Sequence, residues 1–99
     1  MTRVVVFSPR AISDIAELLD YLLPRAGERT TRRFIDDLVD YCEGSALFPE
    51  RGTSQEDIAS GLRVVGYRRR ASIAFLVEDQ TVTIIRIFYA GRAVRLEPG

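Results

Sequence analysis

The stretch "RASIAFLVEDQTVTIIRIFY" (residues 70–89) decides the fold, because two apolar, β-branched runs flank a short polar link. Runs rich in Val, Ile, Phe and Thr on either side of a turn are typical of a β-hairpin. Closing the hairpin through "EDQT" (78–81) also predicts its register. The expected pairs are Val77 with Val82, Phe75 with Ile84, and Ile73 with Arg86.

Side chains alternate between the two faces of a strand, so this register divides the hairpin residues into two sets. One face would carry Ala71, Ile73, Phe75, Val77, Val82, Ile84 and Phe88. The other would carry Arg70, Ser72, Ala74, Leu76, Thr83, Ile85, Ile87 and Tyr89. We expect the first face to pack against helices. The second is apolar enough to predict partial cover by another element or another chain.

Upstream of the hairpin, the sequence predicts two more strands and two helices. "RVVVF" (3–7) and "LRVVGY" (62–67) read as strands, and 49–61 as a polar loop between helices and sheet. Ser8 and Pro9 stand where a helix begins, and Pro24 and Gly27 where it ends. Its helical-period apolar residues are Ile12, Ile15, Ala16, Leu19, Leu22 and Leu23. A second helix runs from 28–31 to Gly44, with Phe34, Ile35, Leu38, Tyr41 and Cys42 on its apolar side.

These elements predict a single domain over residues 1–99 with an α+β, two-layer architecture in the order β-α-α-β-β-β. The five-residue link "PRAGE" makes the helices an N-terminal hairpin, packed on one face of an antiparallel sheet. We expect the first strand to pair with a C-terminal strand. No apolar run approaches the length that spans a bilayer, and the lone cysteine fits a reducing compartment, so we expect a cytoplasmic protein with no membrane contact.

Charge is distributed unevenly along a chain whose formal net charge is zero. All fourteen basic residues are Arg. Residues 1–60 hold seven Arg against eleven acids, whereas residues 61–99 hold seven Arg against three. Such asymmetry is an argument about partners rather than about fold.

Several chemistries are closed to this sequence. It has no His, so the usual Ser–His and Cys–His nucleophiles and the common zinc sites are absent, and no Gly-rich phosphate loop follows a strand. Cys42 reads as a buried, inert thiol. Asp36 and Asp40 are one helical turn apart, but ion pairs with Arg32 and Arg33 explain them without a metal. We therefore expect neither a metal nor a cofactor.

Arginine and tyrosine in the last third remain as candidates for function. Arg63 and Arg86 interrupt strands, where a charge is costly unless it is paired or reaches an open edge. Each could form a salt bridge to a helix acid such as Asp14 or Asp40. Each could instead belong to a cationic surface for phosphates or for a carboxylate-rich peptide.

The chain resembles the ParE branch of the RelE/ParE toxin superfamily. The matching stretches are "FSPRAISDIAELLDYL", "FIDDLVDYCEGSALFPERG" and "GLRVVGYRRRASIAFLVEDQTVTIIRIFYAGR", which follow in order over nearly the whole chain. The resemblance implies a type II toxin that inhibits DNA gyrase and is neutralised by direct binding of a cognate, ParD-like antitoxin in a hetero-oligomer. On this basis Arg63, Arg86, Tyr89 and Arg92 are predicted to contact the target, and Arg68, Arg69 and Arg70 the antitoxin.

Two alternatives stay open. RelE-type relatives cleave messenger RNA on the ribosome, and here Arg63, Arg68, Arg92 and Tyr89 would be the catalytic set. The chain has no Lys or His to move protons, and Arg is a poor proton shuttle, so we prefer the non-enzymatic interpretation without direct nucleic-acid binding. The other alternative is a nontoxic antitoxin-binding module, because Ala93 stands where many such toxins carry an acid and Tyr89 where a His is common.

Overall fold

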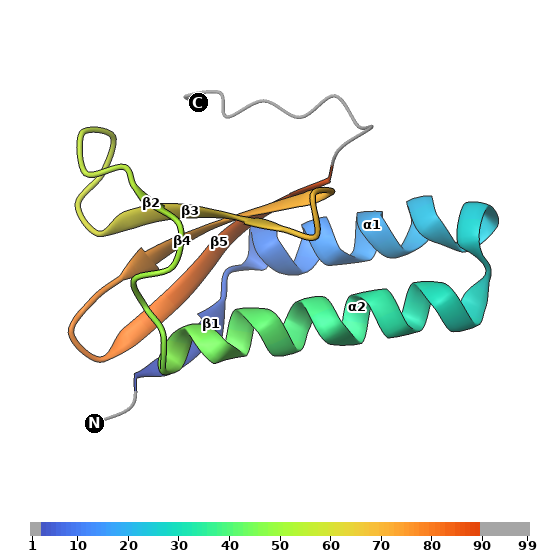
Figure 1. The fold of residues 1–99 in the computed structure, drawn as a ribbon, viewed down its shortest axis with the longest axis horizontal. Coiled ribbons are helices and arrows are strands. Elements are labelled where there is room, and N and C mark those ends of the chain that lie inside the picture. Colours follow the sequence, from blue (N-terminus) through green and yellow to red (C-terminus); the bar gives the residue numbers. More distant parts are fainter. Residues whose placement is uncertain (1–2, 90–99) are drawn as a thin grey trace.

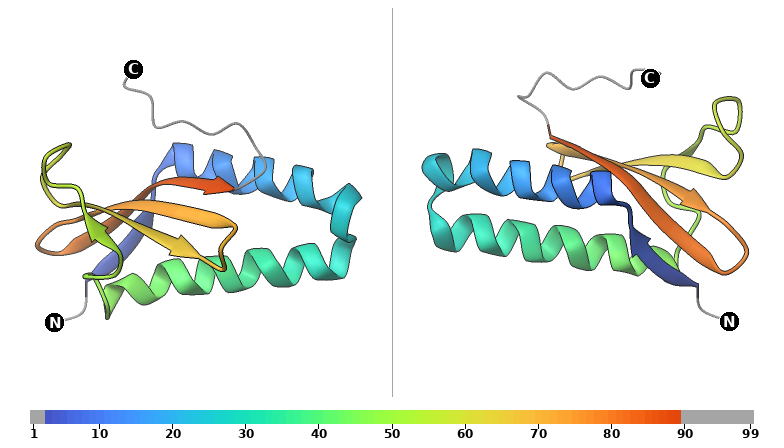
Figure 2. Two further views of the ribbon diagram at one scale, coloured as in Figure 1. Left: turned by 45° about the horizontal axis from the view of Figure 1, so that its top comes forward. Right: turned by 180° about the vertical axis from the view of Figure 1, so that it is seen from behind.

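The structure, a computed structural model, describes residues 3–89 and forms two layers. Two antiparallel helices lie side by side on one face of a five-stranded sheet (Figures 1 and 2). The elements are β1 (Val4–Phe7), α1 (Pro9–Ala26), α2 (Glu28–Glu43), the 3-10 helix η1 (Gly44–Ala46), β2 (Thr53–Ser54), β3 (Leu62–Tyr67), β4 (Ala71–Val77) and β5 (Thr81–Tyr89). The predicted α+β class and the order of its main elements are confirmed.

Local sequence signals set the limits of the helix hairpin. The Ser8 hydroxyl caps α1 by accepting a hydrogen bond from the Ala11 amide at 3.0 Å, and Pro9 occupies the first turn. Pro24 was expected to end this helix but lies inside its last turn. The chain reverses at Gly27, whose φ of 84° favours glycine. The link between the helices is therefore one residue rather than five.

The sheet has the strand order β1-β5-β4-β3-β2 and is antiparallel except at one edge. β1 pairs with β5 as expected for the first strand, but the pairing is parallel, with Val4 opposite Thr81. The opposite edge carries β2, which pairs Thr53 with Val64 inside the segment that the sequence predicted to be loop.

A β-bulge in β5 corrects the predicted hairpin register. Val77–Val82 and Phe75–Ile84 pair as predicted, but Ala74 then pairs with Arg86. Ile85 is therefore the extra residue on β5, and the predicted pairing of Ile73 with Arg86 is wrong. Because one inserted residue reverses the alternation beyond it, every later residue of β5 changes face.

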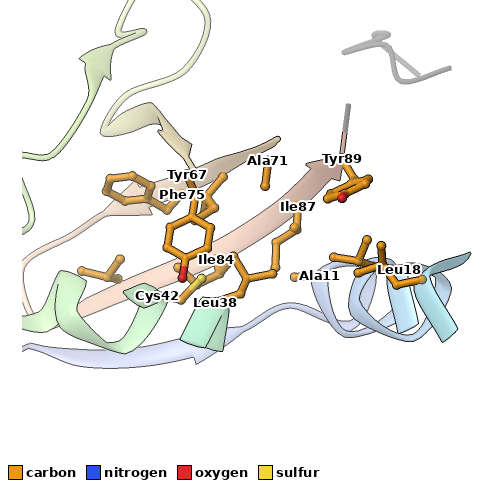
Figure 3. Close-up of a cluster of buried hydrophobic side chains, with 13 residues drawn as sticks. Ala11, Leu18, Leu38, Cys42, Tyr67, Ala71, Phe75, Ile84, Ile87 and Tyr89 are labelled. Carbon is orange, nitrogen blue, oxygen red and sulfur yellow. The ribbon is translucent and has the colours of Figure 1, made fainter. Parts of the chain in front are cut away.

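The core between helices and sheet reflects this change of face. Figure 3 shows the sheet residues Phe75, Ile84 and Ile87 meeting Leu18, Leu38 and Cys42 of the helices, as well as Tyr89 on the same side of the sheet. Ile87 and Tyr89 therefore belong to the helix-facing core, contrary to the predicted register. Phe88 moves to the outer face, where it packs with Leu62 and Ala74 and is 8% exposed.

Candidate partner-binding surface

The three successive arginines form the turn between β3 and β4. Arg68 and Arg69 both have positive φ, 50° and 61°, and the Arg70 amide donates to the Tyr67 carbonyl at 3.2 Å. Two central residues of positive φ define the type I′ hairpin turn, for which Asn and Gly are favoured. Placing an Arg in this left-handed region costs about 1 to 2 kcal/mol per residue. The turn thus holds cations at positions where other residues would be more stable.

The arginines of this turn differ in their contacts. Arg68 donates from Nη2 to an Asp37 carboxylate oxygen of α2 at 3.0 Å, and its guanidinium lies 5.1 Å from the centre of the Tyr67 ring. Arg69 and Arg70 are exposed. Among residues 3–89, neither takes part in a salt bridge, so the turn offers two cations to a partner.

Arg63 is held inside the fold by backbone oxygens rather than by a helix acid. Its Nε donates to the Arg51 carbonyl at 2.9 Å, and its Nη2 donates to the Glu50 and Gly52 carbonyls at 2.9 and 3.1 Å. Both predicted carboxylate partners are therefore replaced by loop carbonyls. The contacts fix the segment before β2 against β3.

Arg86 has the carboxylate partner that the sequence offered as one of its two possibilities. Its Nε lies 2.9 Å from Asp14 Oδ2, and Nη2 lies 3.4 Å from Oδ1. The same Oδ2 accepts the Ile87 amide at 2.9 Å, just beyond the point where β1 stops covering the edge of β5. Asp14, 7% exposed, therefore completes the hydrogen bonding of β5 as well as the charge of Arg86.

Tyr89 lies in the aromatic part of the core. Its ring makes edge contacts with Tyr21 and Phe34, each at 5.9 Å between ring centres, and the residue is 9% exposed. Arg92 lies outside the described residues. Arg63, Arg86 and Tyr89 are each engaged by contacts within the fold, and their role at a target stays a prediction.

The sequence analysis missed a second apolar stripe, on α1. The helix buries Ala11, Asp14, Leu18 and Leu22 against the sheet. Three of the six apolar residues predicted for this helix face outward instead: Ile12 is 58% exposed, Leu23 is 36% exposed, and Ala16 is exposed. Leu19 is half-buried beside them. Residues 12, 16, 19 and 23 follow the 4-3-4 spacing of a helix–helix seam.

The comparison with known proteins identifies the family. A family model for the ParE toxin of the type II toxin–antitoxin system parDE matches residues 5–94. The chain belongs to this family. Among solved structures, a chain of the chromosomal ParDE toxin–antitoxin system from P. aeruginosa matches at a TM-score of 0.75 and 18% identity, covering 89% of this chain and 96% of that chain.

A second structural match supports the same fold. The conserved hypothetical protein HP0894 from Helicobacter pylori matches this ParE-family chain at a TM-score of 0.55 and 14% identity, covering 95% of this chain and 100% of that one. At these identities the likeness shows the fold alone. No functionally curated protein matches the sequence.

Three further questions about the described residues of this ParE-family chain concern a reactive thiol, a metal site and a membrane-spanning helix. Burial raises the pKa of the Cys42 thiol from 9.0 to about 12, although Arg51 acts in the opposite direction. A thiol that stays protonated is a poor nucleophile, which fits the predicted inert residue. Within residues 3–89, no cluster of three His, Cys, Asp or Glu side chains could hold a metal. No helix in that range has both the length and the apolar character needed to cross a membrane.

Proposed function

We propose that the chain is the toxin of a type II toxin–antitoxin pair, inhibits DNA gyrase in the cytoplasm, and is silenced by direct binding of its antitoxin. Membership of the ParE toxin family supports the toxin class. The observation that carries the antitoxin part is the outward stripe of α1. A folded chain gains nothing by leaving Ile12 and Leu23 in water, whereas an amphipathic partner helix would bury them.

The arginine turn supplies the charged part of this interface. Arg69 and Arg70 are exposed cations, and the positive φ of Arg68 and Arg69 is a backbone conformation that is costly for non-glycine residues. Strain kept at a surface turn suggests a functional role. Carboxylates of the antitoxin would bind these guanidinium groups, which form well-directed paired hydrogen bonds.

Two experiments test the proposal. The chain is expressed briefly in a bacterium without its antitoxin while DNA and protein synthesis are pulse-labelled in parallel, and purified protein is added to a gyrase supercoiling assay. We expect DNA synthesis to fall first and supercoiling to stop. An earlier fall in protein synthesis with unaffected gyrase would favour RNA cleavage instead. Against that alternative, Arg63 and Tyr89 of its catalytic set are already engaged in contacts within the fold. No effect on growth would favour the nontoxic module.

The antitoxin interface is tested separately by charge reversal. For each charge reversed, changing Arg68, Arg69 and Arg70 to Glu should weaken antitoxin binding by more than the same change at Arg32 and Arg33, which lie on the exposed side of α2. Calorimetry against the antitoxin encoded beside the gene measures both affinities. Equal losses per reversed charge at the two places would show that only total charge matters.

A further inference from the structure

A line of stacked arginine and aromatic side chains runs from the arginine turn along the junction of α2 and β3. Its middle is buried, because Tyr67 is 7% exposed and part of the core, whereas both of its ends are exposed. Arg68 stacks over Tyr67, Tyr67 contacts Tyr41 at 4.9 Å between ring centres, and Arg51 lies 4.0 Å from the Tyr41 ring centre. Arg51 also lies 5.5 Å from the ring centre of Phe48. We call these five residues the stacked strip: Arg68, Tyr67, Tyr41, Arg51 and Phe48.

The far end of the strip presents two large apolar side chains to solvent. Leu47 is 66% exposed and Phe48 59%, and together with Pro49, Glu50 and Arg51 they line a shallow surface pocket. Exposure of single apolar residues is ordinary, but here two are adjacent and an arginine borders them. Aromatic residues and arginine dominate the energetics of protein interfaces.

This apolar end is held firmly in place. Arg51 Nη1 donates to the Tyr41 carbonyl at 2.6 Å, and the Leu47 and Phe48 amides both donate to the Gly44 carbonyl at 3.0 Å. The three hydrogen bonds from Arg63 to loop carbonyls fix the chain that follows. A side chain displayed on a fixed backbone loses little entropy when it binds, which raises affinity.

We propose that the two exposed ends of the stacked strip bind one extended segment of the antitoxin. The segment would place an acidic side chain at the arginine turn and a large apolar side chain against Leu47 and Phe48. The four stacking distances limit the separation of Arg68 and Phe48 to about 20 Å, the length of about six extended residues. The inference rests on the proposed function, since it needs an antitoxin, and it adds a second contact surface to the outward stripe of α1.

The charges around the strip favour a protein over a nucleic acid. The exposed Phe48 ring and the exposed arginines of the turn could also receive unpaired bases. Carboxylates border this one along its length, however: Asp37 beside Arg68, Asp40 and Glu43 on the exposed side of α2, and Glu50 in the pocket. A phosphate backbone would meet these anions. A peptide with one acidic end and one apolar end would meet a cation and an apolar surface in the matching order.

Photo-crosslinking of the full complex tests the inference. Benzoylphenylalanine replaces Phe48 or Arg69 in the whole chain, and Ile58 serves as the control because it is an exposed apolar loop residue, 65% exposed, outside the strip. We expect crosslinks from positions 48 and 69 to one antitoxin segment, at sites no more than about six residues apart, and none from position 58. Crosslinks from 48 and 69 to unconnected segments, or equal yield at 58, would overturn the proposal.

Affinity measurements supply the second readout. Phe48→Ser should weaken antitoxin binding about tenfold, as expected for an interface anchor, while Ile58→Ser leaves it unchanged. If the parent chain binds the antitoxin and Phe48→Ser binds it with the same affinity, the proposal for the strip is rejected, but the proposed function is not. Failure of the parent chain to bind the antitoxin would reject the proposed function itself. Binding of a uridine oligonucleotide that is lost in Phe48→Ser, without any effect on antitoxin binding, would assign the strip to RNA.

Discussion

Replacing Asp14 by Ala should destabilise the fold more than any other change to a charged residue among residues 3–89. The Asp14 carboxylate accepts the Arg86 Nε and the Ile87 amide, each at 2.9 Å. Its side chain is 6% exposed and that of Arg86 is 26% exposed. The change to Ala leaves a buried amide without an acceptor and a half-buried guanidinium without a counter-charge.

The magnitude follows from these two losses. Removing one member of a buried ion pair costs about 3 to 5 kcal/mol. Arg86 keeps some access to water, so the lower end of that range applies to Asp14→Ala, about 3 kcal/mol. For a domain of this size, such a loss lowers Tm by roughly 12 to 24 °C.

Urea unfolding followed by circular dichroism measures the difference. Asp14→Asn is the matched control, because its amide oxygen still accepts from Ile87 while the charge is lost. A double change with Arg86→Met should recover part of the Asp14→Ala loss, since the stranded cation is gone. A loss of stability below about 1 kcal/mol for Asp14→Ala would refute the reasoning, because the Asp14–Arg86 pair would then contribute no more than an exposed salt bridge does.

Three further changes test local features. Raising the pH from 8 to 10 should cost on the order of 1 kcal/mol through Cys42, because the folded pKa is about 12 and the unfolded one 9.0. This stability is present below pH 9 and is lost as the pH rises towards 12. Cys42→Ala should flatten the pH dependence measured by urea unfolding, and an equal slope in both proteins would contradict this reasoning. Arg69→Gly should stabilise the fold by about 0.5 kcal/mol, because the φ of Arg69 is 61°. Arg70→Gly should destabilise it, because Arg70 does not have a positive φ. Thermal unfolding compares the two variants, and a change of stability in the same direction for both would argue against backbone strain. Gly27→Ala should cost about 1 to 3 kcal/mol, because φ 84° and ψ 166° form a backbone conformation that is essentially restricted to glycine, although its Cβ would meet open space. Gly52→Ala should destabilise more than Gly27→Ala, because its Cβ would lie 2.2 Å from a β3 carbonyl oxygen. Equal losses in urea unfolding would show that backbone conformation alone decides.

The sequence predicted the sheet well where its pattern is local and failed where one residue breaks the pattern. The hairpin link at 78–81 fixed the first pairs, because turn and register are set within a few residues. The bulge at Ile85 has no such signal, since Ile85 lies in an unbroken apolar run. Its cause is tertiary: β1 ends at Phe7, and Ser8 and Asp14 then take over the edge of β5. Pairings separated by more than seventy residues could not be inferred from the hairpin alone.

The candidate surface shows a similar limit. Helical periodicity in α1 correctly indicated an amphipathic helix, but apolar residues at 11, 12, 15, 16, 18, 19, 22 and 23 cover more than one face. Periodicity alone cannot say which stripe meets the sheet. Packing chose the stripe that contains Ala11, 0% exposed, because a small residue lets the helix approach β5 closely. The outward stripe of α1 could be identified only after the structure showed which residues of the helix are buried.

The arginines of the chain divide by what their guanidinium groups contact, and this division predicts how salt acts on antitoxin binding. Arg51, Arg63 and Arg86 donate to carbonyls or to a buried carboxylate within the fold. Within residues 61–89, only the turn at 68–70 presents exposed arginines to a partner. Salt screens exposed charges strongly but leaves apolar contacts intact.

Binding to the antitoxin should therefore weaken only modestly between low and high salt, with most of the change in the association rate. Arg69→Ala should reduce that salt dependence, whereas Phe48→Ser should lower the affinity equally at every salt concentration. Surface plasmon resonance over a salt series separates the two effects. Complete loss of binding at high salt would mean that charge dominates the interface, and the outward stripe of α1 and the apolar end of the strip would then contribute little.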